Sequence, residues 1–312
     1  MDTPVISIVF SFRNEEEVLP ELVRRVVAVV EAVGDYELIF VNDDSVDRSL
    51  EVLAALREEN SRIKIINMSR RFGVSPCVIA GLAASKGDAA IYMDSDLQDP
   101  PEIIPQMVRE WKNGADIVHT VRTHRRGESA AKMWITKMAY KAINAFSDIS
   151  LLENAGDFKL LSRRVVEEIL QLGEMDPYLR GLSVWVGFNQ VVVKYERDAR
   201  SAGQSKFGLF SSLNPYKEFL RGITSFSTVP LYFALFFGFT VSMVSFLLLC
   251  YIIIMKIAGM NLPGWTAIMS AILFLSGVIL STIGLLGVYV GRIYDQVRSR
   301  PKYIIKKQVG FS

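Results

Sequence analysis

Two long stretches near the carboxyl end of the chain contain no charged residue. They are Gly222–Met255 and Ile257–Gly291, and only Lys256 separates them. A helix needs about 20 apolar residues to cross the roughly 30 Å of hydrocarbon in a bilayer. We therefore expect two transmembrane helices, near Val229–Met255 and Thr266–Gly291. A pair of buried core helices is the alternative, but helices of soluble domains average only about 11–12 residues.

Basic residues lie on the outer flanks of both stretches. Lys217 and Arg221 precede the first stretch. Six more follow the second: Arg292, Arg298, Arg300, Lys302, Lys306 and Lys307. By the positive-inside rule both flanks are cytoplasmic, so we expect a multi-pass protein of the plasma (inner) membrane whose amino-terminal part is cytoplasmic. The start of the chain, "MDTPVISIVFSFRNEEE", lacks the basic region and long apolar run of a signal peptide.

The chain before these stretches alternates between strand and helix patterns. Apolar, β-branched runs predict four buried strands: "VISIVFSF", "YELIFVND", "IKIINMS" and "DAAIYMD". Between them, segments such as "RNEEEVLPELVRRVVAVVEAV" have apolar residues three to four positions apart and predict helices. Strands that alternate with helices over short connections favour an α/β fold with a mostly parallel, doubly wound sheet.

Acidic residues follow three of the four predicted strands. They are Glu15 to Glu17 after the first, Asp43 and Asp44 after the second, and Asp94, Asp96 and Asp99 after the fourth. Sheets of this class bind ligands at the carboxyl ends of their strands. Carboxylates that converge there need a cation or hydrogen-bond donors, and Mg²⁺ or Mn²⁺ suits carboxylate, phosphate and water oxygens. We therefore expect a divalent metal cofactor. A single acidic residue after a strand is more often a helix cap, which is our interpretation of Asp47 and Asp99.

Other common sites have no support in the sequence. The two cysteines, Cys77 and Cys250, are far apart, and neither zinc spacing nor a glycine-rich phosphate loop is present. Any phosphates are therefore expected to meet a metal ion together with Arg and Lys side chains. We expect no nucleic-acid partner.

Several motifs occur in an order that resembles a known enzyme family. The segments "SFRNEE", "VNDDSVDRS", "DSDLQDPPE", "GDFKLLSRRVV" and "RSAGQSKF" are similar to those of the inverting glycosyltransferases with a GT-A (Rossmann-like) fold. More narrowly, the chain resembles the polyprenyl-phosphate glycosyltransferases, which include dolichol-phosphate mannosyltransferase. "GRIYDQVRSRPKYII" after two spans resembles their bacterial bactoprenol glucosyltransferase subgroup. The resemblance covers nearly the whole chain and departs at Arg13, Asp44 and Ser75–Pro76, near the expected nucleotide and sugar sites.

The resemblance implies a role for each residue that matches a family motif. Four residues would bind the nucleotide: Glu15, Asp43, Asp94 and Gln98. Two would hold the metal: Asp94 and Asp96. The catalytic set would be Asp157, Arg200 and Lys206, and the contacts to the acceptor phosphate would be Arg122, Arg126, Arg200 and Lys206. The acceptor is largely anionic near neutral pH, so we expect Asp157 to position groups or oppose oxocarbenium charge rather than to abstract a proton.

The implied reaction is metal-dependent transfer of a sugar, with inversion, to a membrane polyprenyl (undecaprenyl) phosphate at the cytoplasmic face. We expect glucose from UDP-glucose, with GDP-mannose or a UDP-amino sugar as the alternative donor. A processive polysaccharide synthase is disfavoured because the chain has no "QxxRW" motif. A catalytically silent membrane partner subunit is the alternative outside enzymes.

These patterns divide the chain into four parts. We expect residues 1–206 to form the GT-A domain, 207–227 an interfacial amphipathic segment, 228–291 the two transmembrane helices, and 292–312 a cytoplasmic basic tail. Small residues along the second span would let helices approach closely, so we also expect a homo-oligomer. These residues are Gly277, Ser281, Gly284, Gly287 and Gly291.

Overall fold

A computed structural model describes residues 6–123, 152, 155–196, 226–259 and 264–311. Within these residues, eight strands form one sheet in the order β7-β5-β6-β4-β1-β2-β3-β8. The strands are β1 (Ile6–Phe12), β2 (Tyr36–Asn42), β3 (Ile63–Met68), β4 (Ala89–Asp94), β5 (Ile117–Arg122), β6 (Ala155–Ser162), β7 (Gln190–Tyr195) and β8 (Ile305–Val309). The helices are α1 (Leu19–Val30), α2 (Ser49–Glu59), α3 (Val74–Ala84), the 3₁₀ turn η1 (Pro101–Ile103), α4 (Ile104–Lys112), α6 (Arg163–Gln171), α7 (Leu179–Trp185), α9 (Val229–Ile257) and α10 (Trp265–Val297).

The centre of the sheet is parallel and its remaining strands are mixed. β1 pairs in parallel with β2 and β4, β2 pairs in parallel with β3, and β5 pairs in parallel with β7. β6 is antiparallel to both β4 and β5, and β8 is antiparallel to β3. The predicted α/β fold with a mostly parallel sheet is confirmed.

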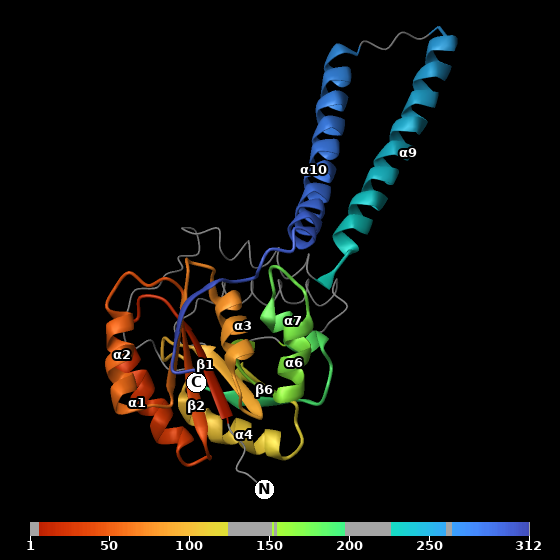
Figure 1. Cartoon of the computed structure of the whole chain (residues 1–312). Helices are drawn as coiled ribbons and strands as arrows, with labels where there is room; N and C mark the ends of the chain where they lie inside the picture. Colours follow the sequence, from red (N-terminus) through yellow and green to blue (C-terminus); the bar gives the residue numbers. More distant parts are fainter. Residues whose placement is uncertain (1–5, 124–151, 153–154, 197–225, 260–263, 312) are drawn as a thin grey trace.

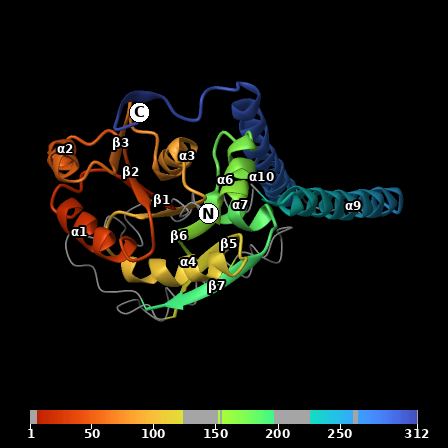
Figure 2. The same cartoon turned by 60° about the horizontal axis from the view of Figure 1, so that its bottom comes forward.

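Helices cover both faces of the sheet (Figure 2). On one face α1, α2 and α4 pack over a core in which Leu22 and Leu53 lie with Phe10. On the other face α3, α6 and α7 pack over a second core that contains Val9. The approach of α3 to β1 depends on Gly81, because a Cβ there would lie only 2.3 Å from Val9 Cγ1. The central strands β1, β2 and β4 are therefore buried on both faces, as their continuous apolar runs predicted.

The helices α9 and α10 project together from the α/β domain (Figure 1). Both are long and apolar enough to cross a membrane, with candidate spans Val229–Met255 and Phe274–Val297. Their large apolar side chains are exposed; Phe236, for example, is 72% exposed. α10 continues nearly two turns beyond Gly291, where the predicted span ended.

The extended end of α10 contacts the α/β domain through polar side chains. Gln296 Nε2 donates a hydrogen bond to the carbonyl of Gly173 at 2.7 Å, and the N–H of Met175 donates to Gln296 Oε1 at 3.1 Å. Tyr289 Oη donates to the carbonyl of Ser227, just before α9, at 2.8 Å. These bonds tie both apolar helices to the domain that carries the site.

The carboxyl-terminal segment contains a strand that the sequence analysis did not foresee. β8 extends the sheet beyond β3, with Ile65 opposite Val309 and Ile66 opposite Gln308. Just before this pairing, the N–H of Ser69 donates to the carbonyl of Ile304 at 2.9 Å. The limits of the four predicted parts remain predictions, but residues 305–309 belong to the sheet rather than to a free tail.

Candidate active site

The sheet topology brings distant acidic residues to one edge. β1, β2 and β4 are parallel, so the residues that follow them, including Asp43 and Asp94, lie at the same edge. β6 runs antiparallel to β4, which places its beginning, with Asp157, at that edge as well. The ends of β5 and β7 also lie there, with Arg122 opposite Tyr195. Residues more than 100 positions apart in the sequence can therefore share one site.

Asp94 is the most strongly perturbed carboxyl at this edge. Burial and, after it, the negative charges of Asp157, Asp96 and Asp99 together raise its pKa to about 7, against the opposing charge of Arg180. Four carboxylates around one point leave an excess of negative charge that Arg180 only partly offsets. Such an excess favours a proton or a metal cation at Asp94.

Arg180, on α7, stabilises the ionised carboxylate of Asp157. Arg180 Nε donates to Asp157 Oδ1 at 2.9 Å, and Arg180 Nη2 donates to Oδ2 at 2.5 Å. Burial by itself would raise the pKa of Asp157, but the charge and hydrogen bonds of Arg180, with smaller contributions from Lys159 and Arg122, lower it below the usual value. Both side chains remain partly accessible, Arg180 at 38% and Asp157 at 25%.

A tight turn presents Asp96 beside Asp94. The N–H of Gln98 donates to Asp96 Oδ1 at 3.2 Å, and Leu97 between them has a positive φ of 55°. Ser95 Oγ donates to the carbonyl of Ser11 and fastens the turn to β1. The two predicted metal ligands are thus held on one short loop.

Asp94 and Asp96 fit a divalent cation only as part of a larger set. Among the residues that the structure describes, no group of three or more His, Cys, Asp and Glu side chains could hold a metal ion. Two carboxylates with substrate phosphate and water oxygens are, however, a usual Mg²⁺ environment. The raised pKa of Asp94 indicates that a cation there would meet uncompensated negative charge.

Asp43 supports the loop before α3. Its Oδ1 accepts hydrogen bonds from the N–H groups of Phe72 at 2.6 Å and Gly73 at 3.2 Å, and its Oδ2 accepts from Gly73 at 3.0 Å. Gly73 has a φ of 96°, which favours glycine. Asp43 is thus buried at the predicted nucleotide edge and also fixes the backbone of that edge.

The loops after β1 and β2 are joined by hydrogen bonds. The N–H of Glu15 donates to Ser49 Oγ at 2.9 Å, and the N–H of Glu16 donates to Asp47 Oδ2 at 3.3 Å. Asp47 Oδ1 also accepts from the N–H of Ser49 at the beginning of α2. Glu15 therefore lies at the same edge as Asp43, on a loop fixed by α2.

Asp99 is not a helix cap, and that interpretation was wrong. It is 1% exposed and accepts a hydrogen bond from Tyr195 Oη at 2.5 Å. Arg122 completes a buried triad, because its Nη2 donates to Asp99 Oδ2 at 3.3 Å and its Nε donates to Tyr195 Oη at 3.0 Å. An acidic side chain buried this deeply is costly to the fold without a partner, and Arg122 supplies one.

The domain that carries this edge matches a known protein family. The model of "Glycosyl transferase family 2" matches residues 7–170, slightly more than half of the chain. The chain belongs to glycosyl transferase family 2. The match extends from β1 through α6 and contains Asp43, Asp94 and Asp157.

Full-length relatives place this glycosyltransferase within a bacterial subgroup. It is 40% identical to "Uncharacterized glycosyltransferase YkcC" of Bacillus subtilis over 97% of this chain and 94% of that protein. It is also 40% identical to "Bactoprenol glucosyl transferase" of Shigella phage SfII, over 97% of each chain. "Prophage bactoprenol glucosyl transferase homolog" of Escherichia coli is 38% identical over 97% of this chain and 98% of that protein. The predicted resemblance to the bactoprenol glucosyltransferase subgroup is confirmed.

Solved structures are more distant. Glucosyl-3-phosphoglycerate synthase from Mycobacterium tuberculosis is 20% identical, with a TM-score of 0.47, over 70% of this chain and 77% of that chain. A likeness at this level does not identify a ligand.

The predicted site residues of the glycosyltransferase divide into two groups. The structure brings together Asp94, Asp96, Asp157 and, through Asp99, Arg122, and it places Glu15, Asp43 and Gln98 on loops at the same sheet edge. Three others lie outside the residues that the structure describes: Arg126, Arg200 and Lys206. Their roles remain predictions.

Sequence reasoning missed Arg180 and Lys159. Arg180 lies in "DPYLRGLS", a segment with no periodic pattern that marks it. Lys159 gave a clearer signal, because it is a charged residue within the apolar strand "FKLLS", at a position whose side chain points into the core. A charge inside a strand that is buried on both faces needs a partner, and this is the feature that could have identified it.

Proposed function

We propose that this glycosyltransferase moves a sugar from a nucleotide diphosphate donor to the phosphate of bactoprenol, undecaprenyl phosphate. UDP-glucose is the first choice of donor, supported by the names of relatives that match over almost their entire length. GDP-mannose and UDP-amino sugars are the alternatives. The observation that carries the reaction class is the grouping of Asp94 and Asp157 with Arg180 at the carboxyl edge of the sheet.

A lipid acceptor is supported by the position of this edge relative to α9. Arg180 is followed by Gly181, where a Cβ would lie 2.2 Å from Phe226 Cε2. Phe226 is three residues before α9, and its ring also lies 6.2 Å from that of Tyr178. The residue next to Arg180 thus packs against the segment that leads into α9. This supports a membrane lipid whose headgroup reaches the site.

The proposed chemistry is a single displacement at the anomeric carbon. A bond forms between an acceptor phosphate oxygen and the anomeric carbon, while the bond from that carbon to the donor diphosphate breaks and a nucleoside diphosphate leaves. Attack from the opposite face inverts the configuration. A divalent ion held by Asp94 and Asp96 would supply charge neutralisation for the leaving diphosphate.

The charged side chains at this edge would stabilise the charges that develop during the transfer. Arg180 would add positive charge beside the diphosphate, as preorganised donors do in other transfer reactions. The lowered pKa of Asp157 makes this carboxylate a weak base, which supports a positioning or charge-stabilising role. Arg122, Arg126, Arg200 and Lys206 are kept as proposed contacts of the acceptor phosphate, and Glu15, Asp43 and Gln98 as proposed contacts of the nucleotide.

The same proposal includes the cellular arrangement. Charges at the helix flanks support insertion into the plasma membrane with both flanks in the cytoplasm. Self-association remains part of the proposal and predicts an oligomer in mild detergent. A monomer at all protein concentrations would contradict it.

A donor panel tests the proposed function. Membranes that contain the protein are given short-chain polyprenyl phosphate with radiolabelled UDP-glucose, UDP-N-acetylglucosamine or GDP-mannose, each with Mn²⁺ or with EDTA. We expect one donor to give a lipid-soluble product that EDTA and Asp94→Asn both abolish. Asp88→Asn is the matched control, because Asp88 is exposed and precedes the opposite end of β4. Nucleotide binding without any product would favour a silent partner subunit instead.

A further inference from the structure

Lys159 is a buried lysine directly behind the candidate active site. It lies on β6 two residues after Asp157, and it is only 1% exposed. Its register neighbours are Tyr92 on β4 and His119 on β5. A buried amino group is costly to the fold unless its donors are satisfied. The contacts of Lys159 should therefore show what its position provides.

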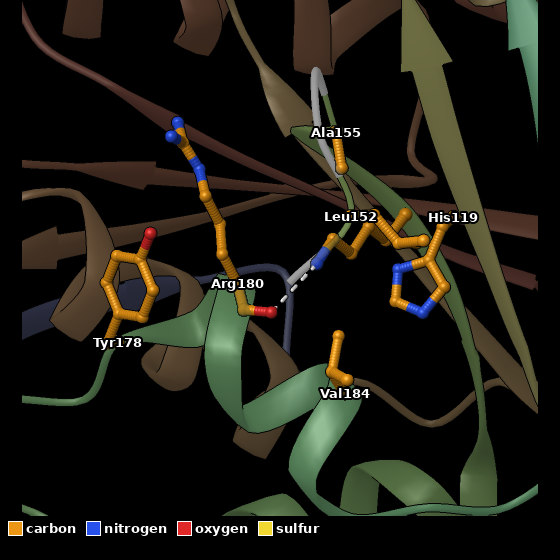
Figure 3. Close-up of a pocket in the computed structure, with 7 residues that line it drawn as sticks. His119, Leu152, Ala155, Tyr178, Arg180 and Val184 are labelled. Atoms are coloured by element: carbon orange, nitrogen blue, oxygen red, sulfur yellow. Dashed lines mark hydrogen bonds between the residues drawn. The ribbon is translucent and has the colours of Figure 1, made fainter. Parts of the chain in front are cut away.

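Among the residues that the structure describes, the side chain of Lys159 donates its hydrogen bonds to α7. Nζ donates to Ser183 Oγ at 2.5 Å and to the backbone carbonyl of Arg180 at 3.5 Å. The second bond is the dashed line that ends on the Arg180 oxygen in Figure 3. Ser183 Oγ donates to the same carbonyl at 3.1 Å. The carbonyl of Arg180 is therefore held by two donors, one from β6 and one from α7 itself.

Arg180 is held at both ends by the same strand. Its guanidinium pairs with Asp157, and its backbone carbonyl is bonded to Lys159, two residues farther along β6. Strand residues two positions apart point to the same face. Asp157 and Lys159, on one face of β6, therefore hold both the side chain and the backbone of Arg180. The Arg180 side chain is 38% exposed, and its contacts with Asp157 restrain its direction.

The space around Lys159 restricts other arrangements. A cavity of about 10 Å³ lies beside it and is lined by His119, Leu152, Tyr178 and Val184 (Figure 3). That volume is about the size needed for one water molecule. Burial, together with the positive charge of Lys159, lowers the pKa of His119 to about 4, so this ring is neutral near pH 7. The amino group of Lys159 is therefore bonded to α7 and has little room to turn away from it.

We propose that Lys159 is a positioning residue: its hydrogen bonds to Ser183 and to the Arg180 carbonyl fix α7 so that the Arg180 guanidinium faces Asp157 and the donor diphosphate. This inference deepens the proposed function and rests on it for the identity of the diphosphate. Lys159 itself touches no reacting atom. Its effect on the reaction passes through Arg180.

A double-mutant cycle tests this coupling. Lys159→Met keeps the length of the side chain and removes its donors, and Arg180→Met removes the guanidinium. Each single variant should lower kcat about 100-fold, because small displacements at a reacting centre are costly, with KM for the donor changed far less. The double variant should be no slower than Arg180→Met alone. Two effects that multiply would show that Lys159 acts independently of Arg180 and would overturn the inference.

Two further measurements separate positioning from general stability. Lys64→Met is the matched control, since Lys64 is a largely buried lysine that pairs with Glu37 at the opposite end of the sheet. It should lower the unfolding temperature while leaving kcat near that of the wild type. A structure of the full-chain Lys159→Met variant should show Arg180 displaced from Asp157. An unchanged Arg180–Asp157 pair in this variant would overturn the inference. Absence of sugar transfer by the wild type would reject the proposed function alone, because the structural test does not depend on activity.

Discussion

Arg180 and Asp157 form a two-point ion pair across α7 and β6, with donor–acceptor distances of 2.9 and 2.5 Å. The pair lies beside Asp94, whose pKa burial and neighbouring carboxylates raise to about 7. One carboxylate at this edge is therefore already compensated by a protein cation, and the other is not. We therefore propose that Asp94 binds the metal ion and that Asp157 contacts the reacting sugar.

Removing the guanidinium of Arg180 should slow sugar transfer. We expect Arg180→Met to lower kcat by about 100-fold, the usual effect of losing one preorganised donor at a developing negative charge. Steady-state transfer with the preferred donor measures this. Arg164→Met is the matched control, because the exposed Arg164 forms a similar two-point pair with the buried Asp116, away from this edge. Equal losses in both variants would mean that the Arg180 pair acts only through stability.

Replacing Asp94 should abolish activity and yet stabilise the metal-free protein. In the unfolded chain an aspartate titrates near pH 4, whereas in the folded protein the pKa of Asp94 is about 7. Between these values the folded state retains a proton that the unfolded state has lost, so stability falls as the pH rises from about 4 to 7. An asparagine carries no titrating carboxyl group, so Asp94→Asn removes this pH-dependent loss of stability.

The measurement is thermal unfolding in EDTA. We expect Asp94→Asn to unfold at a higher temperature than the wild type at pH 8, with a smaller difference at pH 5. Asp88→Asn should show no such pH-dependent gain. A lower unfolding temperature for Asp94→Asn at pH 8 would mean that Asp94 makes stabilising contacts in the absence of metal.

A buried polar cluster at the opposite end of the sheet should matter for stability alone. Glu37 is 5% exposed and accepts hydrogen bonds from Ser7 Oγ and Lys64 Nζ, both at 2.5 Å, and from the N–H of Lys86 at 2.6 Å. Burial opposes its ionisation, but these donors lower its pKa below the usual value. Glu37→Ala should therefore cost about 3 kcal/mol, as for other broken buried pairs.

The sign of the pH effect for Glu37 is opposite to that for Asp94. Its contribution is present above the usual glutamate pKa and is lost as the pH falls through the lowered pKa of the folded state. Unfolding temperatures of the wild type and Glu37→Ala should thus differ most near pH 7 and converge in acid. Glu21→Ala, which removes an exposed pair with Arg24, should show no such difference.

Loss of β8 should weaken both the fold and the nucleotide edge. Truncation after Ser299 removes the strand that covers β3 and the carbonyl of Ile304 that accepts from Ser69. Ser69 begins the loop whose Phe72 and Gly73 bind Asp43. We expect a lower unfolding temperature, more aggregation from the uncovered strand edge and a raised KM for the donor. Lys306→Ala, an exposed change within β8, should leave the unfolding temperature, the aggregation and the KM for the donor unchanged. If the truncated protein behaved like the wild type in these measurements, β8 would be dispensable.

The sequence predicted those features that depend on local pattern or motif order. Apolar runs located β1 to β4, and long uncharged stretches located α9 and most of α10, because burial on both faces and membrane insertion leave strong compositional signals. The convergence of Asp94 and Asp157 was predicted from motif order, and the antiparallel placement of β6 explains it.

Features that depend on distant partners were not accessible from local pattern. Asp99 resembled a cap because its partner Tyr195 lies 96 residues away. Arg180 follows an irregular segment, and its role appears only when α7 is placed against β6. β8 is short and basic, "IKKQV", so its sequence resembles a solvated tail until β3 is seen as its partner.

The most direct test of the central claim uses purified protein in liposomes with undecaprenyl phosphate, Mn²⁺ and the donor identified by the panel. The lipid product is analysed by mass spectrometry, and the configuration of its anomeric carbon is determined by NMR. We predict a polyprenyl phosphosugar with inverted configuration, formed by the wild type and by Asp88→Asn but absent with Asp94→Asn. A product with retained configuration, or one that Asp94→Asn still forms at the wild-type rate, would contradict the account of this site.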